Sequence, residues 1–137
     1  MPKSRSINVL RQTTRKRAVL QAVPFAWIKR LPTPCFVLDK DARFIFANDS
    51  FLELTGYHRR ELTRARFDTL LANAGIRDGL KDLLDLYQGH AMSAIAHDFV
   101  RKNGSKTHVV MDIAPAYEKG SKKVTHAIGC VLSHKRI

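Results

Sequence analysis

Two cysteines and six histidines are the residues of this chain with the widest chemical repertoire. Cys35 and Cys130 do not form the closely spaced, even-numbered pattern of a disulfide scaffold. Nothing else suggests export, so we expect free thiols in a reducing cytosol. Two roles stay open for them: small buried hydrophobic side chains, or a redox sensor.

The histidines do not have the spacing of a metal site, which needs three or four converging ligands. No HxH or HExxH pattern occurs, so we predict surface or half-buried imidazoles and no bound metal. Imidazole titrates near neutral pH, so a pH-sensing role stays open. The six are His58, His90, His97, His108, His126 and His134.

No motif for catalysis is present: there is no Gly-rich phosphate loop, nucleophile elbow, or kinase or phosphodiesterase segment. Asp39 and Asp41 are paired carboxylates, but they fall in a turn, where backbone capping explains them. We therefore predict no catalytic residues and a chain that is not an enzyme.

The positive charge is concentrated at the N-terminus. The net charge is +12, and residues 1–30 hold eight basic residues and no acidic one. Such an arm could contact nucleic acid or another anionic surface, or be a solvated lead-in. No helix-turn-helix, zinc finger or basic zipper is present to read a DNA sequence. The candidate nucleic-acid contacts are Arg11, Arg15, Lys16 and Arg17.

The elements that position these side chains can be predicted from local signals. Residues 35–38 and 43–47 are apolar strands joined by a polar turn, which predicts a hairpin. Asn48 or Asp49 can cap a following helix, and Gly56 suits its C-terminus. A second short helix begins near residue 61.

The second half of the chain predicts one helix and three strands. Strands are expected at 92–102, 106–117 and 124–133, giving an antiparallel sheet with helices on one face. A two-residue turn at 103–104 would pair Phe99 with His108. The helix should bury one apolar side, formed by Ile76, Leu80, Leu83, Leu84 and Tyr87.

Residues 7–23 lack Gly and Pro and predict a helix that Pro24 ends or kinks. An apolar patch follows it, so this segment should pack on the sheet or form a dimer. No apolar run reaches the ~20 residues of a membrane span. We divide the chain into an arm, 1–30, and one domain, 31–137. The candidate interface residues are Leu20, Val23, Trp27 and Ile28.

Several short motifs follow one another from about residue 31 to 133. They are Leu31-Pro32-x-Pro34, Arg43-x-x-x-Ala47-Asn48, Phe51-x-x-Leu54-Thr55-Gly56-Tyr57-x-x-x-Glu61-Leu62, Arg101-Lys102-Asn103-Gly104-Ser105 and Ile128-Gly129-x-Val131. This order resembles the PAS domain family. The chain departs from it at Ala42 and at Thr63 or Arg64, where family members often have Gly, and at His58, where they often have Ser or Thr.

The resemblance implies an α+β fold: a five-stranded antiparallel sheet with helices packed on one face, plus an N-terminal flanking helix. That helix would pack on the outer face of the sheet or pair with a second copy. The implied strand order makes the first and last strands neighbours, which could bring Cys35 close to Cys130.

The resemblance also implies a ligand volume between the sheet and the helices. Its lining would be apolar, so it would hold a small apolar molecule or be a core filled by its own side chains. The lining residues would be Phe51, Leu54, Phe67, Leu71, Leu80, Leu84, Met111 and Ile128.

The known cofactors of similar proteins are disfavoured, and none is predicted. Flavin-binding members place a reactive Cys where this chain has Ala65, and a Gln where it has Val131. Haem-binding members place a His near Arg77, and His90 lies too late in the chain to replace it.

We therefore expect a cytoplasmic, PAS-like sensory and protein-interaction module in signal transduction or transcriptional regulation. It would form a homodimer and act on a signalling protein or output domain. The alternative is a basic regulatory adaptor whose arm contacts nucleic acid.

Overall fold

The computed structural model describes residues 29–118 and 120–137. A single five-stranded antiparallel sheet has the order β2-β1-β5-β4-β3. The first and last strands are therefore neighbours, as expected. The strands are β1 (Cys35–Leu38), β2 (Phe44–Ala47), β3 (Met92–Val100), β4 (Lys106–Tyr117) and β5 (Val124–Arg136).

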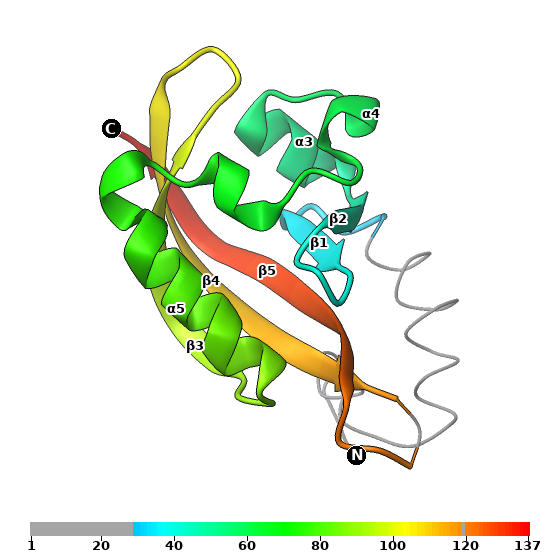
Figure 1. The fold of residues 1–137 in the computed structure, drawn as a ribbon. Helices are drawn as coiled ribbons and strands as arrows, with labels where there is room; N and C mark the ends of the chain where they lie inside the picture. The colour runs from blue at the N-terminus through cyan, green and yellow to red at the C-terminus, as the bar shows by residue number, and fades with distance from the viewer. Residues whose placement is uncertain (1–28, 119) are drawn as a thin grey trace.

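Short helices connect β2 to β3 and lie on one face of the sheet (Figure 1). This face is called the inner face below, and the opposite one the outer face. The helices are α3 (Asp49–Thr55), α4 (Arg59–Leu62), the 3-10 turns η2 (Phe67–Leu70) and η3 (Asn73–Gly75), and α5 (Ile76–Tyr87). The fold is thus the predicted α+β arrangement. The predicted helix at 7–23 lies outside the described residues.

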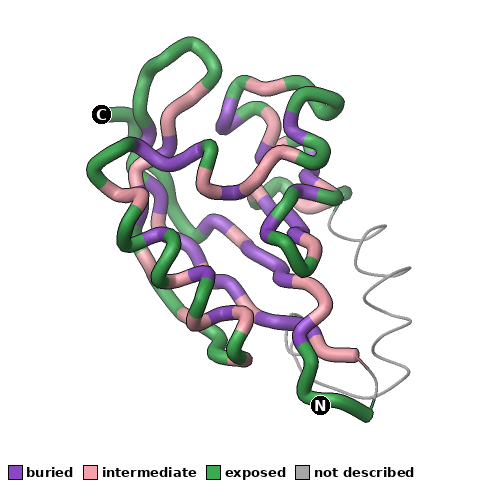
Figure 2. The backbone as a smooth tube through the Cα atoms, in the orientation of Figure 1, coloured by how far each residue is buried: buried purple, intermediate pink, exposed green. Residues whose placement is uncertain are grey.

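The main core lies between the sheet and these helices, and Figure 2 shows the buried backbone on the facing sides. Alternation along β1 assigns the two faces, because successive side chains of a strand point to opposite sides. Phe36 and Leu38 belong to the main core. Cys35 and Val37 belong to a second, smaller cluster on the outer face.

Helix α3 has the ends that its sequence predicts. The Asn48 side chain accepts a hydrogen bond from the backbone N–H of Phe51 at 3.0 Å, so Asn48 is the N-cap. Gly56 ends the helix with φ 80°, a left-handed conformation that costs glycine little. The turn before β2 is also as expected, since Asp39 Oδ1 accepts from the N–H groups of Asp41 and Arg43.

The buried side of helix α5 agrees only in part with the predicted one: Leu83 is in the main core, and Ile76 and Tyr87 pack against it. Gly79, Leu83 and Leu86 face the core, whereas Leu80 and Leu84 are 41% and 61% exposed. Gly79 permits this orientation, because a Cβ there would lie 2.2 Å from a methyl carbon of Leu71.

The β3–β4 connection is longer than the predicted two-residue turn. Val100 pairs with Lys106, so residues 101–105 form the loop. Asp98, and not Phe99, lies opposite His108. The loop is held by helix α3, because Lys102 N–H donates to the carbonyl of Thr55 at 2.9 Å.

Two of the departures from the family pattern occupy left-handed backbone positions. Ala42 has φ 61° and Arg64 has φ 71°. A side chain at such a position is strained by about 1 kcal/mol, which explains why glycine suits both sites. Across the described ranges, no helix is long and apolar enough to cross a membrane.

Candidate sensing and docking site

Five phenylalanine rings fill the space between the sheet and the helices. Phe36 on β1 lies 5.0 Å from the ring of Phe51 on α3 and 5.5 Å from that of Phe67. Phe99 on β3 meets the same two rings edge-on at 6.2 and 5.8 Å. Phe44 completes the cluster, and all five rings are at most 3% exposed. Aromatic pairs at these separations are stabilising contacts.

Five of the eight predicted pocket residues belong to this core: Phe51, Leu54, Phe67, Leu71 and Met111. The other three do not line it. Leu80 and Leu84 border a surface groove of about 340 Å³ between α5 and the β1–β2 turn. Ile128 is buried in the outer cluster beside Val37, its partner across the β1–β5 junction.

The positions tested for cofactor chemistry have distinct surroundings. Val131 is 2% exposed and packs into the main core from β5. Ala65 packs against that core, and its carbonyl accepts a hydrogen bond from Phe44 N–H at 2.9 Å. Arg77 is exposed at the start of α5. None of the three offers a thiol, amide or imidazole to a cofactor.

A second groove, of about 240 Å³, lies where the chain enters the domain. Its lining mixes side chains of both charges with apolar ones, so it differs from the wholly apolar pocket expected from the sequence. Arg101 is already engaged there, since its guanidinium donates to the carbonyl of Leu54 at 3.0 Å. The lining residues are Pro32, Pro34, Ser50, Glu53, Leu54, Arg101, Thr107, His134 and Arg136.

Residues 31–34, directly before β1, are called the entering segment below. Asn48 joins this segment, β1 and α3 at one point. Its Oδ1 accepts from Cys35 N–H at 3.0 Å as well as from Phe51 N–H. Its Nδ2 donates to the carbonyls of Thr33, at 2.8 Å, and Leu31, at 3.4 Å. The sequence predicts the cap but gives no sign of the other bonds, which depend on how the segments pack. These bonds tie residues 31–33 to β1 and α3.

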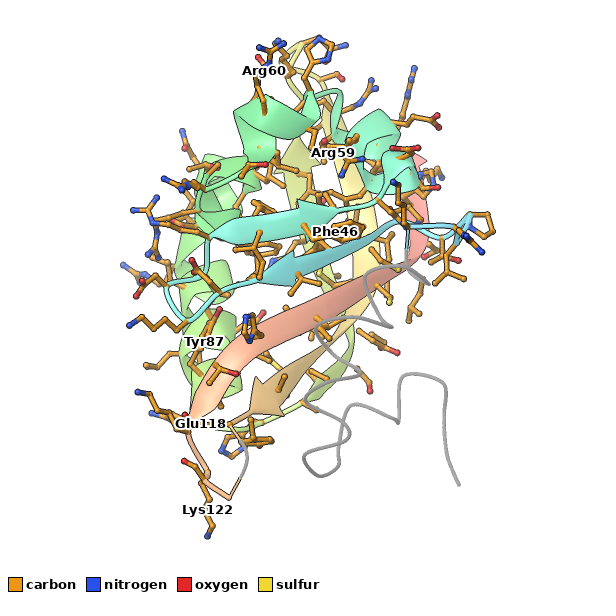
Figure 3. The ribbon with its side chains drawn as sticks, turned by 90° about the vertical axis from the view of Figure 1, so that its right-hand side faces the viewer. Phe46, Arg59, Arg60, Tyr87, Glu118 and Lys122 are labelled. Atoms are coloured by element: carbon orange, nitrogen blue, oxygen red, sulfur yellow. The ribbon has the colours of Figure 1, made fainter. Side chains whose placement is uncertain are left out.

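The outer face carries a small apolar cluster over β2, β1, β5 and β4. Figure 3 views these strands side by side, with Phe46 labelled. Phe46 packs against the cluster and also lies under the Arg59 guanidinium, 5.9 Å from the ring centroid. The buried members are Cys35, Val37, Ala116 and Ile128, and Leu31, Phe46 and Cys130 pack at its border.

Two histidines of the β3–β4 hairpin are paired with carboxylates. His97 is buried on the inner face, with Nε2 2.9 Å from Asp82 of α5. His108 is exposed on the outer face, with Nδ1 2.7 Å from Asp98. The two imidazoles therefore lie on opposite faces of the sheet. Of the residues that the structure describes, no three His, Cys, Asp or Glu side chains gather as a metal site would require.

The sulfur atoms of the two cysteines lie 3.1 Å apart, on the outer face. The predicted closeness is confirmed. The candidate interface and nucleic-acid residues of the arm lie outside the described residues: Leu20, Val23, Trp27, Ile28, Arg11, Arg15, Lys16 and Arg17.

The family model of the PAS domain matches residues 32–132. This match covers most of the chain, and the chain belongs to the PAS domain family. A sequence search of curated proteins finds no match.

Solved structures share this fold at low sequence identity. The crystal structure of a Rhodobacter sphaeroides LOV protein has a TM-score of 0.73 at 16% identity and covers 85% of this chain and 66% of that one. A PAS domain from a two-component sensor histidine kinase has a TM-score of 0.63 at 12% identity and covers 88% and 99%. An RNA-binding Light-Oxygen-Voltage receptor has a TM-score of 0.68 at 22% identity and covers 97% of this chain but 36% of that one. The chain is thus a PAS sensory domain of the kind found in signalling proteins.

Proposed function

We propose that this chain is a non-catalytic, cytoplasmic signalling module that works by docking, first to a second copy of itself and then to an output protein. Transcriptional control is the output we favour. The observation that carries the proposal is the ring cluster, because it fills the volume in which an enclosed ligand would lie.

An enclosed ligand would have to displace closely packed rings. Phe36 touches three others, at 5.0 to 5.6 Å. Protein interiors are close-packed, and opening a cavity costs free energy in proportion to its volume. This favours surface contacts over an apolar ligand as the way a stimulus reaches the domain. Ala65 and Val131 likewise disfavour flavin adduct chemistry, and Arg77 disfavours haem ligation.

The surfaces we assign to docking are the outer face and residues 1–30. Mixed apolar and polar surfaces of this kind suit regulated interfaces, where a few aromatic anchors carry most of the affinity. Trp27 and Ile28 are the proposed anchors of the dimer, supported by Leu20 and Val23. The change of state would be a shift in how the arm and the sheet pack.

Sedimentation equilibrium and native mass spectrometry of the purified chain test this proposal. We expect a dimer, weakened by Trp27→Ala and Ile28→Ala but not by Ile45→Ala on edge strand β2. A monomer at every soluble concentration would refute self-association. A copurified apolar molecule, retained under native conditions, would instead support the enclosed-ligand alternative.

A second candidate function is nucleic-acid binding by the arm. Two observations favour it: the acid-free run of eight basic residues, and the fold likeness to an RNA-binding receptor over 97% of this chain. Binding of this type is driven by counterion release and weakens steeply with salt.

Its test is the salt dependence of RNA and DNA binding by the full chain. Substituting Gln for Arg11, Arg15, Lys16 and Arg17 should lower the slope of log K against log salt by up to about 4, since each phosphate contact contributes about 0.9. A control with the same change in net charge replaces exposed lysines of the domain, and should keep the slope. These lysines are Lys40, Lys81, Lys122 and Lys123. Absence of binding at low salt would exclude this function.

A further inference from the structure

We propose that Cys35 and Cys130 form a redox-responsive pair, at which a hydroperoxide converts two thiols into one reversible disulfide between β1 and β5. The site lies on the outer face and is independent of the ring cluster. Its role as a stimulus rests on the proposed signalling function, whereas the disulfide chemistry does not.

The register of the two strands places the thiols side by side. Cys35 and Cys130 are direct partners in the β1–β5 ladder. Both backbone polar groups of Cys35 bond to Asn48, on the side of β1 that faces away from β5. Its N–H donates to Asn48 Oδ1, and its carbonyl accepts from Asn48 N–H. The two cysteines therefore form a non-hydrogen-bonded pair, the type in which facing side chains are closest, with Cα atoms about 4.5 Å apart. That separation is within the range that disulfides bridge.

The two cysteine side chains also point toward each other. The Sγ atoms are 3.1 Å apart, and both side chains belong to the outer cluster. Closing to a disulfide length requires the sulfurs to approach by about 1 Å, without any change of register. A structural role alone would need only two small apolar side chains here.

The two thiols have unequal environments, which gives each a separate task. Cys35 is fully buried and Cys130 is partly exposed. The hydrogen bond from the Cys35 thiol to Cys130 raises the pKa of Cys35, and burial raises it further. The same bond lowers the pKa of Cys130, against the opposing effects of burial and of Asp112 on the neighbouring strand. Cys130 is therefore the attacking thiolate and Cys35 the resolving thiol.

The chemistry has two balanced steps. The Cys130 thiolate attacks the terminal oxygen of the hydroperoxide, the O–O bond breaks, and an alcohol leaves after protonation, with sulfenic acid left on Cys130. The Cys35 sulfur then attacks the Cys130 sulfur, the S–O bond breaks, and the Cys35 proton leaves with the hydroxide as water. The peroxide gains two electrons and the two thiols lose two. A cellular dithiol reverses the change by thiol–disulfide exchange.

The disulfide would act on the point where the entering segment meets the sheet. Pro34, directly before Cys35, accepts a hydrogen bond from Val131 N–H, directly after Cys130, at 2.9 Å. Asn48 ties Cys35 to Thr33 and Leu31. A covalent link at this position would hold β1, β5 and the entering segment together, on the proposed docking surface.

The test is peroxide treatment of the reduced full chain, with N-ethylmaleimide quenching in denaturant and mass spectrometry. We expect an intact mass lower by two hydrogens, no maleimide adduct, one non-reduced peptide pair containing both cysteines, and recovery with dithiothreitol. The folded chain should form the bond faster than the chain in urea. Two maleimide adducts after treatment, bonds mainly between chains, or equal rates in the folded and unfolded states would each overturn the proposal.

The single variants separate the two roles. Cys35→Ser should leave a sulfenic acid on Cys130 that dimedone traps. Cys130→Ser should leave Cys35 unmodified while the chain is folded, and rapid oxidation of Cys35 there would refute the assignment of roles. Sedimentation of the reduced chain reports on docking separately, so failure of either proposal can be recognised without the other.

Discussion

The two faces of the sheet carry different kinds of side chain. The inner face presents large rings from β1, β2 and β3 to rings from the helices, and every member is almost fully buried. The buried part of the outer face presents aliphatic side chains and a thiol, with Phe46 and a second thiol among the partly buried residues at its border. A face filled by rings can change little without unfolding. In our proposals the outer face changes its covalent state or its partner, so we assign regulation to it.

The comparison is tested most strongly by deleting one ring from each face. Phe36→Ala on β1 should cost about 3–5 kcal/mol in the free energy of unfolding, since it opens a cavity among three other rings. Phe46→Ala on adjacent β2 is the matched control and should cost clearly less, because Phe46 is only partly buried. Urea unfolding measures both, and equal losses would mean that the two faces do not differ in this way.

Asn48 is the contact common to both faces, and its loss should have the next largest effect. Asn48→Ala removes the cap of α3 and leaves the buried N–H of Cys35 without its acceptor. We expect a cost of about 2–4 kcal/mol. Asn48→Asp keeps the acceptor but not the amide donor to Thr33 and Leu31, so its unfolding midpoint should lie between those of wild type and Ala.

Two adjacent residues of β5 compare the faces at a smaller scale. A Cβ added at Gly129 would lie 2.2 Å from the Phe36 ring, directly across the strand pair. Gly129→Ala should therefore cost about 1–3 kcal/mol by overpacking. Cys130→Ala, on the outer face, should cost about 1 kcal/mol or less. The order of the two thermal midpoints checks the assignment, and the reverse order would contradict it.

Most of the fold follows from local signals in the sequence. The hairpin, the Asn48 cap and strand β4 at 106–117 all agree with expectation. Each depends on short-range chemistry: turn-forming side chains, a capping amide, and alternating apolar residues.

The predictions of buried side chains differ from the structure where two orientations fit the local sequence pattern equally well. At those positions tertiary contacts determine which side is buried. Leu80 and Leu84 satisfy a helical apolar pattern as well as Leu83 and Leu86 do, and tertiary contacts such as the close approach of Gly79 to Leu71 select the buried side. Ile128 lies in a run that is apolar on both faces, so its side of the sheet depends on the register with β1. The structure therefore places these three predicted pocket residues outside the main core.

A contact at the exposed rim of the inner layer should have the smallest effect and depend on pH. Glu61 of α4 receives a hydrogen bond from Lys102 Nζ at 2.5 Å and another from His58 N–H at 2.8 Å. Both lower the pKa of Glu61 below its ordinary value. A carboxyl whose pKa falls on folding stabilises the folded state above its unfolded pKa, and loses that contribution as pH falls through the folded pKa.

Glu61→Gln should therefore lower the thermal midpoint slightly at neutral pH. The difference from wild type should shrink as pH falls below the ordinary pKa of a glutamate, about 4.3. Added salt should shrink it as well, because exposed ion pairs are screened. Glu53→Gln, at an exposed carboxylate on α3, is the control for the loss of one negative charge. A Glu61→Gln difference that stayed constant from neutral to acidic pH would show that the contribution of Glu61 does not come from its charge.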